Sequence, residues 1–333
     1  MRTRHLLICS VMTAVAVLEF AIAQSIKFGA DPGPSGSTTT AALPAAATPP
    51  PVYDVGHLLK PEGKFLGVSL SGDPTAVDNV KAYQALIGKQ PDMLTIFESF
   101  DDDFAASQVR TAYQQGALPV VRWEPLNAKL DDIAAGKYDA YITKFAGEIR
   151  RVNVPIALTF AHEMNGNWYS WGAKKVKPAT YVAAWRHLYD LFQTVDARNV
   201  IWTWTPNVIN PVPSVKLKPL YPGDKYVDWI GIDGYYTHNG KHTYSTLFGP
   251  TKRAVRRFTD KPFLIVETGG EPGSERPAWI RDLVRGVAAD DEMLGFVYFN
   301  QNGSARWKID TDAASLQAMR TQAANKKFGF RVR

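Results

Sequence analysis

The sequence predicts an α/β fold, a (β/α)8 TIM barrel, and three observations support this prediction. Eight short runs of β-branched and aromatic residues recur after residue 53. Most of them are separated by stretches with apolar residues three and four positions apart, a spacing typical of amphipathic helices. The runs are continuously apolar, as expected for parallel strands that are covered on both faces. Regular alternation of strand and helix over this length favours a (β/α)8 barrel.

The elements follow one another in a regular order. Strands are predicted, in sequence, at residues 65–70, 93–100, 118–123, 155–161, 200–205, 229–235, 262–267 and 294–300. Helices are predicted at residues 76–87, 104–115, 140–151, 181–195, 244–258, 278–288 and 313–324. A Pro-rich loop, 207–222, follows the fifth strand in place of a helix. A doubly wound sheet is the alternative, but the segment after the first strand, 69–74, fits neither G-x-G-x-x-G nor a P-loop.

The first part of the chain is predicted to lie outside the barrel. Arg2 and Arg4 precede an almost wholly apolar run, 6–18, and the small-x-small pattern Ala-Ile-Ala at 21–23. This arrangement predicts a secretory signal peptide at 1–23, cleaved after Ala23, and therefore a secreted or periplasmic protein. A retained anchor is the alternative, although the run is short for a transmembrane span, so no stable membrane insertion is expected. Residues 24–52 predict a disordered Pro/Ala/Thr/Gly-rich linker, followed by one domain at 53–333.

Composition excludes several classes of function. The only cysteine is Cys9, which excludes a disulfide scaffold, a Cys-based zinc site and a Cys nucleophile after it. A formal net charge of +6 is mild for 333 residues, so no nucleic-acid partner is expected. His162 and Glu163 lack the second histidine of H-E-x-x-H, and no G-x-S-x-G is present. No metal or cofactor is expected.

Carboxylates and aromatic residues gather where the predicted strands end, which is the edge of a barrel that carries the chemistry. Glu163 and Glu267 end the fourth and seventh strands. Two such carboxylates suit the hydrolysis of a glycosidic bond, in which one stays protonated and the other stays ionised. Aromatic rings suit the flat faces of sugars. The candidate substrate-binding residues are Trp123, Glu124, His162, Trp168, Trp171, Asp233, Tyr235 and Asn300.

Other interpretations of these residues stay open. Glu124 suits either a substrate contact or a salt bridge to a cation such as Arg122. His162 also suits a structural role, and Trp171 also suits core packing. Trp202 and Trp204 suit the packed interior as well as a sugar platform.

Three motifs carry a resemblance to a known family. They are HEMNGNWYSWG at 162–172, GIDGY at 231–235 and IVETGG at 265–270. In their order and spacing they resemble glycoside hydrolase family 26, a family of (β/α)8 retaining glycosidases, and the likeness runs from residue 65 to residue 310. The resemblance implies that Glu163 is the general acid/base and Glu267 the nucleophile. It also implies that His162 and Trp168 line the sugar site and that Tyr235 donates a hydrogen bond to the nucleophile.

Two strand ends depart from the pattern of the family's mannanases. Those enzymes commonly end the third strand with Trp-His-Pro, where this chain has Trp-Glu-Pro at 123–125. They also tend to carry Trp-Arg at the end of the eighth strand, where this chain has Tyr-Phe-Asn-Gln at 298–301. The family's activities are β-1,4-mannanase, mixed-linkage β-glucanase and β-1,3-xylanase. The departures favour a β-glucan substrate, with β-1,4-mannan as the alternative.

The predicted signal peptide and the resemblance together imply an exported, endo-acting retaining β-glycanase whose partner is a β-linked polysaccharide or oligosaccharide. Two other hypotheses stay open. One is a non-catalytic carbohydrate-binding protein on the same scaffold, although the retention of both glutamates argues against it. The other is a hydrolase that trims nascent chains beside the exopolysaccharide synthesis machinery.

Overall fold

Eight parallel strands form a closed barrel in the computed structural model, which describes residues 50–333 except 210, 241 and 331. Each strand pairs with the next, and β1 pairs with β8 to close the sheet. The strands are β1 (Phe65–Leu70), β2 (Met93–Ser99), β3 (Leu118–Glu124), β4 (Ile156–Phe160), β5 (Val200–Trp204), β6 (Trp229–Asp233), β7 (Phe263–Thr268) and β8 (Met293–Asn300). The predicted (β/α)8 barrel is confirmed.

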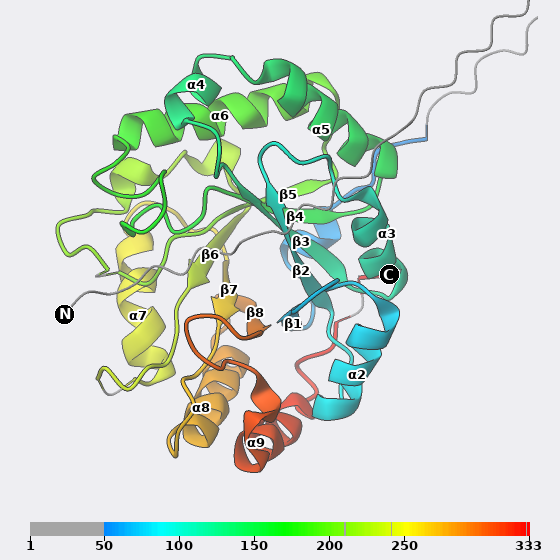
Figure 1. Ribbon diagram of the computed structural model, residues 1–333, viewed down its shortest axis with the longest axis vertical. Helices are drawn as coiled ribbons and strands as arrows, with labels where there is room; N and C mark the ends of the chain where they lie inside the picture. Colours follow the sequence, from blue (N-terminus) through cyan, green and yellow to red (C-terminus); the bar gives the residue numbers. More distant parts are fainter. Residues whose placement is uncertain (1–49, 210, 241, 331) are drawn as a thin grey trace, which may run out of the picture. The chain divides into compact units, whose positions relative to one another are not determined.

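Helices surround the barrel (Figure 1). They are α1 (Gly56–Leu59), α2 (Val77–Ile87), α3 (Ala106–Gln114), α4 (Leu130–Ala134), α5 (Asp139–Val152), α6 (Pro178–Thr194), α7 (Tyr244–Val255), α8 (Arg276–Ala289) and α9 (Ala313–Ala323). All seven predicted helices are present. The short helices α1 and α4 were not predicted, because so few turns give no readable periodicity. Within the described ranges, none of the helices combines the length and apolarity needed to cross a bilayer.

The loop after β5 is confirmed, and it contains the 3-10 turn η1 (Lys218–Leu220), followed by η2 (Asp224–Tyr226). The compact unit begins at Pro50, slightly earlier than the predicted start at Tyr53. The Pro50 and Pro51 carbonyls accept hydrogen bonds from Arg150 and Asn153 at the end of α5. The predicted signal peptide and most of the predicted linker lie outside the described residues.

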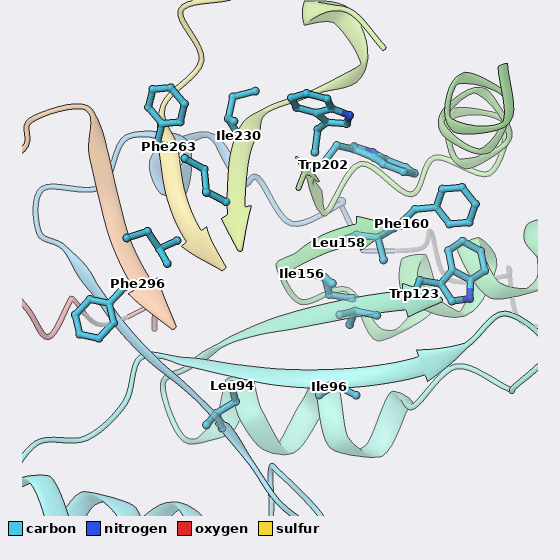
Figure 2. Close-up of a cluster of buried hydrophobic side chains, with 14 of the residues drawn as sticks. Leu94, Ile96, Trp123, Ile156, Leu158, Phe160, Trp202, Ile230, Phe263 and Phe296 are labelled. Atoms are coloured by element: carbon cyan, nitrogen blue, oxygen red, sulfur yellow. The ribbon is translucent and has the colours of Figure 1, made fainter. Parts of the chain in front are cut away.

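Side chains alternate between two buried layers along each strand. Outward-facing side chains such as Ile96, Trp123, Phe160 and Trp202 belong to one large buried cluster with the helices (Figure 2). Inward-facing ones such as Val120 belong to a second cluster that fills the barrel. Trp202 and Trp204 both belong to the outer cluster, which excludes a sugar platform and explains why their strand reads as continuously apolar.

The barrel interior is packed so closely that one strand position requires glycine. An added Cβ at Gly67 of β1 would lie 2.7 Å from the Met93 Cβ and 2.8 Å from the Val297 Cγ2. These two side chains come from β2 and β8, the strands that pair with β1 on either side, so both contacts would be made within the barrel interior. The barrel is therefore a filled core and not a pore.

We expect Gly67→Ala to lower the free energy of unfolding by about 1–3 kcal/mol, because the extra methyl group overpacks the interior. Gly147→Ala is the matched control: Gly147 lies within α5, where an added Cβ meets nothing within 4 Å. That substitution should raise the free energy of unfolding by up to about 1 kcal/mol through helix propensity. Guanidinium unfolding of both variants measures the difference, and equal effects would contradict the packing argument.

Candidate functional site

The inward-facing residues become polar at the carboxyl ends of the strands. Thr159 of β4 hydrogen-bonds the Thr205 hydroxyl at 3.1 Å and the Thr203 carbonyl at 3.2 Å. Ser69 at the end of β1 accepts a hydrogen bond from Gln301 at 2.7 Å. The apolar filling of the barrel therefore stops below this rim, and side chains there can hold charge.

Arg122 of β3 is the central cation of the rim. Its side chain is fully buried, and its two terminal nitrogens donate to both carboxylate oxygens of Asp233 on β6, at 3.2 and 2.5 Å. One of these nitrogens also lies 3.6 Å from the Glu267 Oε2 on β7. Burial raises the pKa of Asp233, and the guanidinium of Arg122 acts in the opposite direction. The pair places a fixed positive charge beside Glu267.

Glu163 is positioned by a strained turn directly after β4. Ala161 and Glu163 both have left-handed backbone conformations, with φ of 45° and 54°. Each such residue costs of order 1 kcal/mol or more, so the surrounding structure has to hold it. The Glu163 amide donates to the Thr205 carbonyl at 2.7 Å, and the Gly166 amide donates to the Glu163 carbonyl at 2.8 Å. These bonds fix the direction of the Glu163 side chain.

The Glu163 carboxylate is buried and accepts two hydrogen bonds. Trp168 Nε1 donates to one oxygen at 2.6 Å, and Asn207 Nδ2 donates to the other at 2.5 Å. Asn207 is itself held by two reciprocal bonds with Asn165, at 2.8 and 2.9 Å. Burial, followed by the charge of Glu267, raises the pKa of Glu163 to about 7, against the opposing effects of Asn207, Arg122 and Trp168. The group is therefore able to hold a proton near neutral pH.

Glu267 has a hydrogen-bond donor at one carboxylate oxygen and a cation near the other. The Tyr235 hydroxyl donates a hydrogen bond to its Oε1 at 2.5 Å, while Arg122 lies beside its Oε2. The Tyr235 ring packs against Trp307 and Phe299, with ring centroids 4.5 and 6.1 Å away. The site thus combines a buried carboxyl group whose pKa is raised, Glu163, with one that contacts a hydrogen-bond donor and a cation, Glu267.

His162 is a buried residue that contacts other side chains of the rim. Burial and the charge of Arg122 lower its pKa well below the usual value, so the imidazole is neutral. Its Nε2 lies 3.1 Å from the Tyr169 hydroxyl and 3.7 Å from Glu124 Oε1. Trp171 donates to the His162 carbonyl at 2.7 Å, and its ring stacks on Tyr169. Buried Trp171 therefore orders this segment, which agrees with the packing role that the sequence also allowed, and its substrate contact stays a prediction.

Glu124 lies at the rim of β3 with a partly exposed side chain. It contacts His162, and the ion pair with Arg122 considered from the sequence does not form between these two described residues. Burial, together with the charges of Glu267 and Glu163 and against the effect of Arg122, raises its pKa to about 7. Glu124 is thus a third carboxyl group at the same rim.

The predicted sugar contact of Trp123 is wrong. Trp123 is fully buried in the helical layer, where it stacks on Phe145 of α5 with ring centroids 4.1 Å apart. The physical reason is strand alternation: Arg122 and Glu124 face inward, so the residue between them faces outward.

Asp233 and Asn300 are buried and bind partners within the chain, which gives no support to their predicted sugar contacts. Asp233 has no exposed surface, and its carboxylate forms an ion pair with Arg122. The Asn300 Oδ1 accepts a hydrogen bond from the Ile309 amide at 2.8 Å, so this buried side chain holds the loop after β8. Phe299, one residue earlier, faces the rim instead, since it packs on Tyr235.

The side chain of Trp168 is 43% exposed and its Nε1 donates to Glu163, and its contact with a sugar stays a prediction. Sequence reasoning missed Asn207 as a partner of Glu163, Arg122 as the bridging cation and Phe97 as a partly exposed aromatic of the rim. Inward alternation along β2 and β3 could have identified Phe97 and Arg122. No comparable signal pointed to Asn207. In the part of the chain that the structure describes, no group of three His, Cys, Asp or Glu residues could hold a metal ion.

Comparisons with known proteins agree with this geometry. Residues 100–259 match the model of glycosyl hydrolase family 26. Endoglucanase H of Acetivibrio thermocellus is 31% identical over 257 residues, which cover 72% of this chain and 28% of that protein. The β-1,3-xylanase TXYA of a Vibrio species is 26% identical over 291 residues, which cover 76% of this chain and 60% of that protein. The chain thus spans less than two thirds of each of these relatives.

The fold also has close counterparts among solved structures. The catalytic domain of the endo-β-1,4-mannanase of Bacillus sp. JAMB-750 superposes with a TM-score of 0.64 at 16% identity. The superposition covers 80% of this chain and 87% of that one. At this identity the likeness establishes the shared barrel.

We expect Arg122→Met to lower the free energy of unfolding by about 3–5 kcal/mol, because it leaves the Asp233 carboxylate buried without its partner. The double variant Arg122→Met/Asp233→Leu should recover most of that loss, since it removes both charges. Urea unfolding measures both variants, and an additive loss in the double variant would show that the pair is not coupled.

We expect Asn207→Ala to raise the pKa of Glu163 by about one unit, because the amide hydrogen bond stabilises the ionised carboxylate. A ¹³C NMR titration of the side-chain carboxyl measures this pKa, with Glu163→Gln to assign the signal. Asn127→Ala, which removes an amide bound to Asp101, is the control and should leave the titration unchanged. An unaltered pKa in Asn207→Ala would contradict the assigned hydrogen bond.

Proposed function

The chain belongs to glycosyl hydrolase family 26, and on that basis we propose that it is a retaining endo-β-glycanase acting on a β-linked polysaccharide. The supporting observation is the contrast between two carboxyl groups at one rim. Glu163 is buried with its pKa raised to about 7, whereas Glu267 is held by Tyr235 and Arg122. This contrast supports Glu163 as the acid and Glu267 as the nucleophile, the division of roles that glycoside hydrolysis requires.

In the first step the Glu267 carboxylate attacks the anomeric carbon, and Glu163 gives its proton to the leaving oxygen. A covalent glycosyl-enzyme results. Esterified Glu267 no longer carries the negative charge that helps to raise the pKa of Glu163. The Glu163 pKa therefore falls, and the same carboxylate can accept a proton from the water that releases the sugar.

A β-glucan is the proposed substrate, with β-1,4-mannan as the alternative. Endoglucanase H matches this chain over 72% of its length, and Glu124 replaces the histidine found at this strand end in the mannanases of the family. The proposal includes export, which is supported by Arg2, Arg4 and the apolar run 6–18. A polysaccharide made by an exopolysaccharide synthesis complex would suit an exported, tethered hydrolase, and that complex would then be its partner.

We expect Glu267→Ala to lose at least about a thousandfold in turnover, because no group remains to form the covalent intermediate. Glu163→Ala should lose about 10²–10⁴-fold on polymers yet still react with a 2,4-dinitrophenyl β-glycoside, whose leaving group needs no proton. Reducing-end release from mixed-linkage glucan, carboxymethylcellulose, glucomannan, galactomannan and β-1,3-xylan identifies the substrate.

Glu148→Ala, on α5, is the control and should keep the wild-type rate. Near-wild-type turnover by Glu267→Ala would refute the nucleophile assignment. A first product with inverted anomeric configuration, detected by ¹H NMR, would refute the retaining mechanism. If the folded wild type cleaves none of the five polymers, a narrower exopolysaccharide substrate or a role in binding alone is favoured.

A further inference from the structure

A basic groove with a volume of about 520 Å³ lies beside α7. One side of it is formed by α7 and the turn after this helix, and the other by the segment that joins α8 to β8. The helices α7 and α8 are neighbours around the barrel (Figure 1). The groove has four basic side chains, Lys252, Arg253, Arg256 and Arg257, and two acidic ones, Asp290 and Glu292. It therefore carries more positive than negative charge.

Two of the four basic residues are neutralised within the groove. Lys252 Nζ contacts the Asp290 carboxylate and lies 3.0 Å from Glu292 Oε2. Arg256 Nε lies 2.5 Å from Glu292 Oε1. Both basic side chains are largely buried, with 13% and 23% of their surface exposed. These ion pairs therefore tie α7 to the segment before β8, and they occupy both acidic residues of the groove.

Arg253 and Arg257 are the two basic residues that remain. Both are exposed and stand four positions apart, so their side chains lie on one face, and both line the groove. Among the residues that the structure describes, no carboxylate forms an ion pair with either of them. Guanidinium groups bind carboxylates through paired hydrogen bonds. The two arginines therefore provide a site for an anionic ligand from outside the chain.

Small residues leave the groove open beside these arginines. A Cβ at Gly249 would lie 3.1 Å from Arg253 Nη1 and 3.9 Å from Ser245 Oγ, so a position without a side chain separates the hydroxyl from the guanidinium. Tyr244, at the start of α7, also lines the groove, and its ring packs over Gly286 of α8. The groove thus combines two cations with a hydroxyl and an aromatic ring. A sugar that carries a carboxylate has the matching chemistry.

The basic end of the groove lies away from the rim. The guanidinium carbon of Arg256 is 4.2 Å from the ring centre of Phe263, the first residue of β7. Glu267 is four residues farther along that strand, which corresponds to about 13 Å at the usual rise of a strand. Asp290 and Glu292 also precede β8 and do not follow it. The arginines therefore belong to the amino-terminal edge of the barrel, opposite the edge that carries the chemistry.

We propose that this groove is a second polysaccharide-binding site, which takes an acidic polysaccharide along α7 and pairs its uronate carboxylates with Arg253 and Arg257. An anionic bilayer is another surface that arginines attract, but a flat bilayer would not fill a groove of this volume. The inference goes beyond the proposed function, because the groove binds a polymer without cleaving it. An acidic polymer would thereby hold the hydrolase in place while the rim acts on its own substrate.

The test is isothermal titration of the full chain with polygalacturonate, a polymer of uronic acid. Arg253→Gln/Arg257→Gln should weaken binding about tenfold relative to the wild type, because two charge-assisted contacts are lost. Arg253→Lys/Arg257→Lys should retain part of the affinity, since it keeps the charge and loses only the paired hydrogen bonds. Binding by the wild type should weaken as the ionic strength rises to about 0.15 M.

Lys81→Gln/Arg110→Gln is the matched control, because it removes the same charge from α2 and α3 and leaves the groove intact. Its affinity for polygalacturonate should equal that of the wild type. Arg253→Gln/Arg257→Gln should hydrolyse a 2,4-dinitrophenyl β-glycoside at the wild-type rate, since the groove lies away from the rim. Thermal unfolding confirms that each variant is folded.

The outcomes separate the groove from the proposed hydrolysis, because binding is measured without turnover. Absence of binding by the wild type overturns the site. Equal weakening by the arginine variant and by the control also overturns it, since binding would then follow net charge alone. Sedimentation with phosphatidylglycerol vesicles that requires both arginines, without binding of polygalacturonate, overturns the polysaccharide and assigns the groove to a membrane. A loss of dinitrophenyl glycoside hydrolysis in the arginine variant overturns the separation from the rim.

Discussion

The ion pair between Arg122 and Asp233 is the constraint on which the rim depends. Removing two charges from water is costly, and bidentate geometry offsets that cost only in part. The two hydrogen bonds to Asp233 also fix the orientation of the guanidinium, which lies beside Glu267. The same charge helps to keep His162 neutral and opposes the rise in the pKa of Glu163. One buried cation thus acts, after burial, on the pKa values of Asp233 on β6 and of His162 and Glu163 after β4.

The arrangement has a cost in stability. The left-handed turn at Ala161 and Glu163 is strained. The carboxyl groups of buried Glu163 and partly exposed Glu124 have pKa values of about 7 in the folded state, against 4.5 for the free side chain. Because folding raises these pKa values, their contribution to stability is most favourable below about pH 4.5 and is lost as the pH rises to about 7. For each group the loss is on the order of a few kcal/mol.

The sequence predicts the barrel well because strand–helix alternation is a local pattern that repeats eight times. The residues of the rim are harder to predict, because an error of one residue in a strand's position reverses the predicted direction of each side chain. This is why Trp123 was wrongly assigned to the sugar and inward-facing Phe97 was missed. Glu163 was recognised through its motif, because the turn after β4 departs from strand alternation. Asn207 lies 44 residues after Glu163 in the sequence and contacts it only in the folded protein, so no local sequence pattern predicts this hydrogen bond.

The bridging position of Arg122 also bears on how the barrel could be divided. A cut between β4 and β5 would leave Arg122 in one fragment and both of its carboxylate partners, Asp233 and Glu267, in the other. Each fragment alone would then carry a charge that its own residues do not neutralise. Such fragments would be unstable alone but would bind each other selectively. The ion pairs of Arg122 with Asp233 and Glu267 would therefore also direct the reassembly of a split enzyme.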